Sequence, residues 1–460
     1  VYKRQSEQQQ APQSAIFEEE RQKIEAEKSD KRKARKNNGA KRDMHYEMEE
    51  EEHVVYPDDP DFDINKARLF TTVPRICVRY ECIPMRFIKH VYKIHTYRQE
   101  GRLFEGKTPA SAFLNSSYDG SFIAGLMELR YIQSLPVERI INYFEGYGFT
   151  LKKPTAHKLI EKASSLFENL YKCIRQTALS DPYKAADETY YKILVPEKNS
   201  KGKGVRKGYL WVVVGINTGM IYLLYDDGSR SERVILNELG SCKGIIQSDG
   251  YSPYRKLESD AYPHITRIPC LQHIKRKFID CGEDDPDAKR IVEMINTLYQ
   301  NEHKHKIGVD GWTVEQNLVH RKKYAPDILG EIKDVLDEIE ERGDLLPKSE
   351  LREAITYLRN EWNAVVDIFN YGDTYLDNNI VEQMNRYISL SRKNSLFFGS
   401  HKGAERGAIL YTIALTCRMH KVNLFEYLTD VINRTAEWQP NTPIEKYREL
   451  LPDRWEKAND

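Results

Sequence analysis

Alternating apolar and polar residues predict a small sheet in the middle of the chain. Between residues 187 and 195, every second residue from Thr189 onward is apolar, aromatic or β-branched, as on one face of a strand. Two apolar runs, 210–216 and 220–225, lie on either side of the turn-forming residues Asn217-Thr218-Gly219. This pattern is typical of a hairpin. We therefore expect Asp187 to stand where the first strand begins.

The same sheet is expected to continue after a short helix. Residues 229–239 have the apolar spacing of an amphipathic helix, and 244–247 return as a strand that stops at the turn Ser248-Asp249-Gly250. Asp249 is thus expected to leave the sheet close to the place where Asp187 enters it. Residues 265–268 indicate one more strand.

Helical periodicity surrounds the predicted sheet. Residues 121–132 and 136–144 predict two short helices, and 155–179 predict a long third one that Thr155 caps. Short helices joined by turns can dock on DNA as a helix-turn-helix, although ordinary helical packing is the simpler explanation. After the sheet, residues 288–369 are charged and helix-forming, with breaks at Gly343 and Pro347, and we interpret them as a helical insertion between strands.

Residues 67–97 alternate β-forming and charged residues, so we expect a small antiparallel sheet that includes 78–83 and 87–94. Two cysteines and two histidines in this region raise the question of zinc, and they are Cys77, Cys82, His90 and His95. Their Cys-x4-Cys spacing is wide and the loops are short, so we do not expect structural zinc here.

Composition points to a soluble protein of a reducing compartment. The chain has 460 residues, 30% of them charged, and a mean hydropathy of -0.66. No apolar run approaches the ~20 residues of a membrane span, so we expect no membrane partner. Seven scattered cysteines do not form a disulfide framework.

The formal net charge of zero hides separate charge blocks. Residues 1–50 have almost no large apolar side chains, so we expect a solvated tail, either disordered or a solitary helix. Elsewhere, basic residues cluster in short groups that suit a phosphate backbone. The candidate DNA-binding residues are Lys201, Lys203, Arg206, Lys207, Lys275, Arg276, Lys277, Arg392 and Lys393.

One further stretch, 377–394, presents polar groups along one edge of a predicted helix. Asn378, Glu382 and Arg386 recur every four residues, with Asn379 beside them. The opposite edge is apolar and would pack on a sheet; it consists of Ile380, Met384, Tyr387 and Ile388. Taken alone, Glu382 and Arg386 favour a simple surface ion pair.

Three carboxylates from separate elements change this interpretation. Cleavage of a phosphodiester by two divalent cations needs acidic residues that converge on one point, since Mg²⁺ prefers oxygen ligands. Asp187, Asp249 and Glu382 offer such a set, and basic residues lie near each of them in sequence. We expect these three to be the catalytic and metal-binding residues.

Several motifs, in this order, resemble the insertion sequence 66 family of bacterial transposases over roughly residues 65–455. They are Ala186-Asp187-Glu188-Thr189, Ser248-Asp249-Gly250-Tyr251, Cys270-x-x-His273 with Arg276-Lys277-Phe278, Asp377-Asn378-Asn379-x-x-Glu382, Arg392-Lys393-Asn394 and Gly403-Ala404-Glu405-Arg406. The family's usual N-terminal Cys-x-x-Cys pairs are missing, which puts metal-dependent DNA recognition there in doubt.

The resemblance implies an α/β fold, in which an RNase H-like core with a helical insertion follows a small β segment and a helical domain. It implies that Cys270 and His273 support the site of the three acids, together with Asn378, Asn379 and Arg386. A Cys-x-x-His pair alone offers too few ligands for a metal. The expected divisions are a tail 1–64, the β segment 65–108, the helical domain 109–180, the core 181–280, the insertion 281–376, the rest of the core 377–435 and a C-terminal tail 436–460.

The resemblance also implies the activity. We expect a DDE transposase that uses Mg²⁺, or Mn²⁺ in its place, to cut transposon ends and join the 3′-hydroxyl to target DNA. We expect DNA to be its partner, a homo-oligomer on DNA to be its working form, and the bacterial cytoplasm to be its location. Whether accessory proteins encoded by the element also take part stays open. Two alternatives stay open: a related nuclease without strand transfer, and a domesticated copy that only binds DNA.

Overall fold

A computed structural model describes residues 85–457, apart from 92, 94, 100–101, 106–111, 114–115, 199–201, 203, 283, 437 and 439–441. All the described residues belong to one structural unit of the chain. The predicted tail 1–64 and most of the β segment, including Cys77 and Cys82, therefore lie outside the described residues. So do Lys201 and Lys203.

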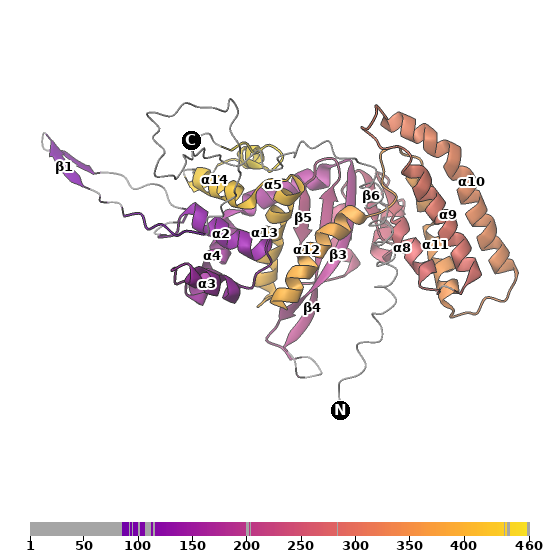
Figure 1. The fold of residues 1–460 in the computed structure, drawn as a ribbon, viewed down its shortest axis with the longest axis horizontal. Helices are drawn as coiled ribbons and strands as arrows, with labels where there is room; N and C mark the ends of the chain where they lie inside the picture. The colour runs from indigo at the N-terminus through magenta and orange to yellow at the C-terminus, as the bar shows by residue number, and fades with distance from the viewer. Residues whose placement is uncertain are drawn as a thin grey trace, which may run out of the picture. The chain divides into compact units, whose positions relative to one another are not determined.

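A mixed five-stranded sheet lies at the centre of this unit (Figure 1). Its strands are β3 (Tyr183–Leu194), β4 (Val205–Gly215), β5 (Ile221–Leu224), β6 (Gly244–Ser248) and β7 (Ile265–Pro269). In space the order is β5-β4-β3-β6-β7. The first three strands pair antiparallel, whereas β6 is parallel to both β3 and β7. The predicted hairpin, the returning strand and the additional strand are thus confirmed.

Two strand boundaries differ from the prediction. β3 begins at Tyr183, so Asp187 lies within the strand and not at its entry. The small residues Ala185 and Ala186 are fully buried there, because β3 is covered by β4 on one side and β6 on the other. β4 begins at Val205, which places Arg206 and Lys207 in a strand and not in the basic loop.

Among the described residues, the helices that precede the sheet are α2 (Gly120–Tyr131), α3 (Val137–Gly146), α4 (Lys153–Leu166) and α5 (Glu168–Ser180). The prediction of one long helix over 155–179 was wrong, because the chain breaks at the buried Phe167. The prediction of Thr155 as the cap was also wrong. Pro154 lies in the first turn, where its fixed φ favours a helix start, and Lys152 occupies the cap position.

The prediction of a strand over 87–94 was wrong for the part of it that the structure describes, because residues 85–91 form no strand. Aromatic packing holds this segment instead: the ring of Phe87 lies 5.0 Å from that of Phe144 and 4.7 Å from that of Phe149. A two-stranded antiparallel hairpin follows, made of β1 (Thr96–Gln99) and β2 (Arg102–Glu105).

Helices also lie between strands of the sheet: α6 (Glu232–Leu239) joins β5 to β6, and α7 (Ser252–Arg255) with the short η1 (Lys256–Glu258) joins β6 to β7. After the sheet come α8 (Leu271–Ile279), α9 (Pro286–Glu302), α10 (Val314–Glu341), α11 (Glu350–Ile368), α12 (Asn379–Ser395), α13 (His401–Met419), α14 (Leu424–Ala436), α15 (Ile444–Tyr447) and η2 (Arg448–Leu450). The helical insertion, α9 to α11, is confirmed as helical. It joins α8 to α12 and not one strand to another, since the described residues after it contain no strand. Among the described residues, no helix is both long enough and apolar enough to cross a bilayer.

Two apolar cores meet at the sheet. One contains the buried side chains of β4 and β5 together with those of α2, α5, α12, α13 and α14. The other is built by α8 to α11 and takes in Tyr183, Ile245 and Ile268 from the strands. The insertion therefore packs directly on the β6–β7 side of the sheet, while α12 lies across β3 and β4 (Figure 1).

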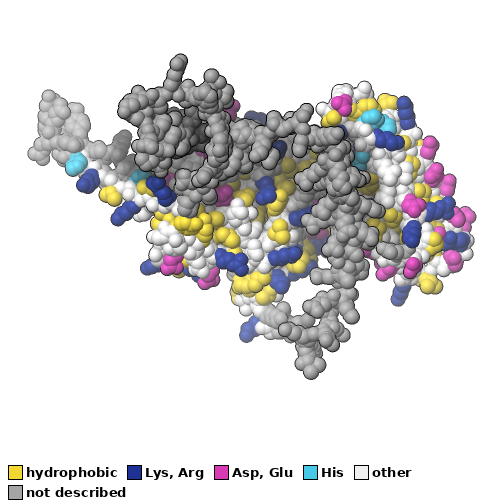
Figure 2. Space-filling view, viewed as in Figure 1, with side chains coloured by type: hydrophobic (Ala, Val, Ile, Leu, Met, Phe, Trp, Pro, Cys, Tyr) yellow, Lys and Arg dark blue, Asp and Glu magenta, His cyan; other side chains and the backbone are white. Residues whose placement is uncertain are grey.

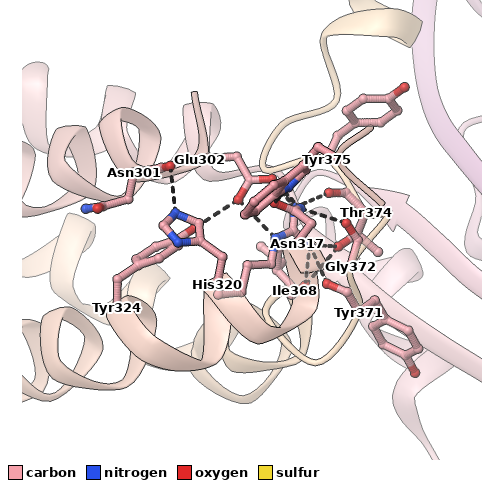
Figure 3. A network of polar contacts seen from close by, with 12 residues as sticks. Asn301, Glu302, Asn317, His320, Tyr324, Ile368, Tyr371, Gly372, Thr374 and Tyr375 are labelled. Carbon is pink, nitrogen blue, oxygen red and sulfur yellow. Dashed lines mark hydrogen bonds and ion pairs between the residues drawn. The ribbon is translucent and has the colours of Figure 1, made fainter. Parts of the chain in front are cut away.

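A strap, residues 371–378, runs from the insertion into α12 and is hydrogen-bonded on both sides. On the insertion side, Arg321 of α10 is fully buried, pairs with Glu302 and donates to the carbonyls of Tyr371 and Thr374 (Figure 3).

On the sheet side, the Tyr183 hydroxyl accepts from the backbone N–H of Tyr375 at 3.0 Å, and the Gln247 amide donates to the Tyr375 carbonyl at 2.8 Å. Buried polar groups that are fully hydrogen-bonded fix one arrangement of the chain. The strap therefore sets where α12 begins.

Candidate active site

Asp187, within β3, and Asp249, directly after the end of β6, lie at matching positions along two neighbouring parallel strands. Ala185 of β3 pairs with Gln247 of β6, and each aspartate stands two positions beyond one of these residues. Side chains two positions apart on a strand share a face. The two carboxylates therefore extend from the same end of the β3–β6 pair and on the same side.

Asp187 occupies an unfavourable place for a negative charge. Burial, then the charge of Glu188 and then that of Asp249, raise the pKa of the Asp187 carboxyl to about 8. Two donors partly offset this rise: the backbone N–H of Glu188 at 2.8 Å and the Asn385 side-chain amide at 2.7 Å. Such crowded carboxylates favour the binding of a cation, which neutralises them.

Glu382 stands in the first turn of α12, between two hydrogen bonds that tie this helix to β3. Asn378, at the cap, donates its side-chain amide to the carbonyl of Ala186 at 3.0 Å. Asn385, one turn after Glu382, donates to Asp187. The third acid is thus brought to the same end of β3 as Asp187.

The ion pair between Glu382 and Arg386 is not seen. Arg386 is exposed, and the Glu382 carboxylate instead lies 3.7 Å from Nδ1 of His273 on α8. Asn379 is also exposed and does not enter the site, whereas Asn378 does. The buried face of α12 is made of Val381, Met384, Ile388 and Ser391, while the predicted Ile380 and Tyr387 are only half-buried.

Several buried polar atoms around Glu382 have no hydrogen-bond partner in the described part of the chain. They are Nδ1 of His273, Oδ1 of Asn378, Oε1 of Glu382 and Oδ1 of Asn385. Burying such groups without partners costs roughly 1–3 kcal/mol each. Three of these atoms are oxygens, the ligands that Mg²⁺ prefers, so the residues present fit a hard divalent cation.

A cavity of about 320 Å³ opens beside Asp249. Its lining combines basic and aromatic side chains: Arg230, Asp249, Gly250, Tyr251, His273, Arg276, Lys277, Asp280 and Tyr357. Arg276 and Lys277 are exposed on α8 as predicted candidates, while Lys275 is not part of this lining. An anionic group next to Asp249 would meet three cationic side chains there.

Contacts that lead to the insertion hold the backbone at Asp249 and Gly250 in place. The buried guanidinium of Arg267 donates to the Asp249 carbonyl at 2.7 Å and pairs with Glu361 of α11 at 2.6 Å. Tyr357, also on α11, accepts from the backbone N–H of Gly250 at 2.8 Å. No motif of the chain selects Tyr357 or Glu361, because α11 has ordinary helical patterning.

Alternating cationic and aromatic side chains run from α12 over β3 and β4 to Asp249, and we name them the cation–aromatic row. Its members are Arg392, Tyr190, Lys207, Tyr209, Arg230 and Tyr251. Successive cation-to-ring distances are 3.8, 4.3, 5.3, 5.2 and 4.1 Å. Arg230 also pairs with Glu188, and its Nε lies 2.9 Å from Oε1 of that carboxylate. The row therefore ends beside the acids.

Charge is distributed differently over the insertion. There, acidic and basic side chains are interspersed on the visible surface (Figure 2), and some of them pair, as Arg290 does with Glu338 and Arg342 with Asp287. Two of the predicted basic residues, Lys207 and Arg392, belong to the cation–aromatic row, and Arg206 and Lys393 are exposed. The row therefore adds the positive charges of Lys207 and Arg392 to that of Arg230, which is paired with Glu188 beside the acids.

The raised pKa of Asp187 predicts how the metal-free protein responds to pH. The folded chain keeps this proton up to about pH 8, whereas an unfolded aspartate releases it near pH ~4, so ionisation of Asp187 destabilises the fold as pH rises between them. Asp187→Asn should flatten this fall, by up to about 1.4 kcal/mol per pH unit. Urea unfolding in EDTA at pH 5–8, with exposed Asp260→Asn as the control, measures it. Equal pH slopes for wild type and Asp187→Asn would contradict the assigned environment.

Comparison with known proteins identifies the family. Residues 115–406 match the family model described as "Transposase IS66 family". The chain is 26% identical over 370 residues to the uncharacterized protein y4jD of Sinorhizobium fredii, which covers 77% of this chain and 70% of that protein. It is 24% identical over 438 residues to y4hP, an uncharacterized protein of the same organism, which covers 90% of this chain and 76% of that one. Because the family model spans more than half of the chain, this protein belongs to the IS66 family of transposases.

Proposed function

We propose that this chain is a DDE transposase that cuts DNA at transposon ends and transfers the resulting 3′-hydroxyl to target DNA. The observation that carries the proposal is the placement of Asp187, Asp249 and Glu382 at one end of the β3–β6 pair, beside buried oxygens that have no hydrogen-bond partner among the residues that the structure describes. Membership of a transposase family supports DNA as the substrate.

The proposed core is RNase H-like. The sheet supports this, since three antiparallel strands are followed by two parallel ones and the first two acids lie on its central neighbours. The helical insertion before the third acid agrees with the arrangement that the family resemblance implies. Asp187, Asp249 and Glu382 would together hold two Mg²⁺ or Mn²⁺ ions. Bound there, the ions would activate an oxygen nucleophile and stabilise the leaving oxygen.

The chain's own residues have distinct roles in this proposal. Asn385 orients the Asp187 carboxylate through its hydrogen bond, and Arg267 fixes the backbone of Asp249. Arg276 and Lys277, which line the cavity next to Asp249, hold the phosphate that is cut. Water attacks that phosphorus and releases the 3′-hydroxyl, which then attacks a target phosphodiester. No covalent protein intermediate is formed.

The cation–aromatic row supplies the approach for DNA in this proposal. Phosphates bind cationic groups, and bases stack on exposed aromatic rings. Tyr190 is 36% exposed, so its ring is available although Arg392 and Lys207 lie against it. A homo-oligomer on DNA, with or without accessory proteins, is the proposed working form.

Glu382→Gln tests the proposal most simply, because it keeps the volume and the helix but removes the charge that holds a divalent ion. On DNA that carries the element's own ends, with Mg²⁺, cleavage should fall by about three orders of magnitude or more, whereas binding and the melting temperature change little. Asp377→Asn is the matched control. Its carboxylate accepts from the backbone N–H of Asn379, and cleavage should persist.

The other outcomes of that assay each contradict part of the proposal. Cleavage retained in Glu382→Gln and lost in Asp377→Asn would make Asp377 the third acid. Wild-type cleavage without joined products would indicate a nuclease without strand transfer. If the wild-type protein binds DNA but does not cleave it in Mg²⁺ or Mn²⁺, and a chelator leaves the binding unchanged, the chain would be a copy that only binds DNA.

The cation–aromatic row predicts a salt effect. Replacing Lys207 and Arg392 by alanine should weaken DNA binding and make the plot of log K against log salt shallower by roughly 1.8, for two lost phosphate contacts. Lys289→Ala with Lys323→Ala, two exposed lysines of the insertion, is the control and should change neither quantity. Fluorescence anisotropy at several salt concentrations measures both. An unchanged slope in the Lys207 and Arg392 variant would make the row a solvated surface.

A further inference from the structure

A cysteine, a histidine and a glutamate meet where the N-termini of α8 and α12 approach each other. Sγ of Cys270, a ring nitrogen of His273 and a carboxylate oxygen of Glu382 all lie within 4.8 Å of one another. The sequence offered only the first two, too few for a metal. The strap supplies the third ligand, because it places the first turn of α12 against Cys270.

The distances suit a small transition-metal ion. Zinc binds imidazole and carboxylate at about 2.0–2.2 Å and thiolate at about 2.3 Å, so tetrahedral ligand atoms lie roughly 3.4–3.7 Å apart. Nδ1 of His273 and Oε1 of Glu382 are 3.7 Å apart. Both atoms are buried and have no hydrogen-bond partner in the described part of the chain, and 3.7 Å is too long for a hydrogen bond between them.

Cys270 is also prepared for such a ligand role. Its sulfur accepts the backbone N–H of Asn378 at 3.2 Å, an interaction that stabilises a metal-bound thiolate. Without a cation, burial raises the pKa of this thiol to about 12, so a bound metal has to displace a proton. Sulfur, nitrogen and oxygen together select a borderline cation such as Zn²⁺ over the harder Mg²⁺.

We propose that Cys270, His273 and Glu382 form a binding site for Zn²⁺ or a similar divalent transition metal, which links α8 to α12. One oxygen of the third acid, Oε1, belongs to this site. Its fourth position is open to water. The inference concerns metal binding only, so it does not depend on the proposed DNA cleavage.

Cobalt spectroscopy of the full chain tests the proposal, because Co²⁺ bound to a thiolate gives a sulfur-to-metal band in the near ultraviolet and visible bands typical of tetrahedral coordination. Replacing Cys77 and Cys82 by serine first removes the other candidate thiols near histidines. In that background, one equivalent of Co²⁺ should give both sets of bands, and stoichiometric Zn²⁺ should abolish them. Cys270→Ser should lose the sulfur band, while Cys242→Ser, a buried cysteine elsewhere, should keep it.

His273→Ala and Glu382→Gln should each keep the sulfur band but weaken cobalt binding by at least about tenfold, because the loss of even a hydrogen-bond partner of a metal ligand typically costs that much affinity. These variants keep the test decisive if Cys270→Ser does not fold, as judged by circular dichroism. Absence of the sulfur band in the background protein, or its persistence in Cys270→Ser, would overturn the proposal. Unchanged affinity in both His273→Ala and Glu382→Gln would overturn it as well.

Discussion

Electrostatic repulsion between carboxylates brought into a partly buried space is the constraint on which this structure depends. Burial and then the charge of Glu188 and of Asp249 raise the pKa of the Asp187 carboxyl, and burial and the charge of Asp249 raise the pKa of the Glu188 carboxyl, so the arrangement is unfavourable without positive charge. Three contacts hold these carboxylates together despite the repulsion. They are the parallel pairing of β3 and β6, the hydrogen bond from the Asn385 amide to Asp187, and the ion pair between Arg230 and Glu188. Such a site is favourable for cations and unsuited to most other ligands.

The helical insertion stabilises this arrangement although its helices carry none of the three acids. From α11, Glu361 acts through Arg267 on the carbonyl of Asp249. From α10, Arg321 fixes the strap that leads into α12 (Figure 3). Loss of one partner of a buried ion pair typically costs about 3–5 kcal/mol, so both contacts resist displacement. The second and third acids are therefore positioned from the same helical element.

Much of the fold, including the elements on or beside which Asp187, Asp249 and Glu382 lie, could be predicted from the sequence, because these elements follow local patterns. Apolar runs located β4 and β5, and the turn after β6 located Asp249. Boundaries set by tertiary packing could not be predicted. The helix break at Phe167, the start of β3 at Tyr183 and the irregular backbone around Phe87 all depend on residues that are distant in sequence. Asn385 was missed for the same reason, since nothing in its own helix shows that Asp187 lies opposite.

The central claim is that Asp187, Asp249 and Glu382 share divalent cations. Crystals grown with Mn²⁺, measured at the manganese absorption edge, test it directly, because anomalous scattering locates the metal without reference to activity. The account predicts two manganese peaks about 3.5–4 Å apart, the separation of two-metal sites, with oxygens of all three acids as ligands. Manganese bound by Asp187 and Asp249 while Glu382 stays away from both ions, or no manganese between the acids, would contradict it.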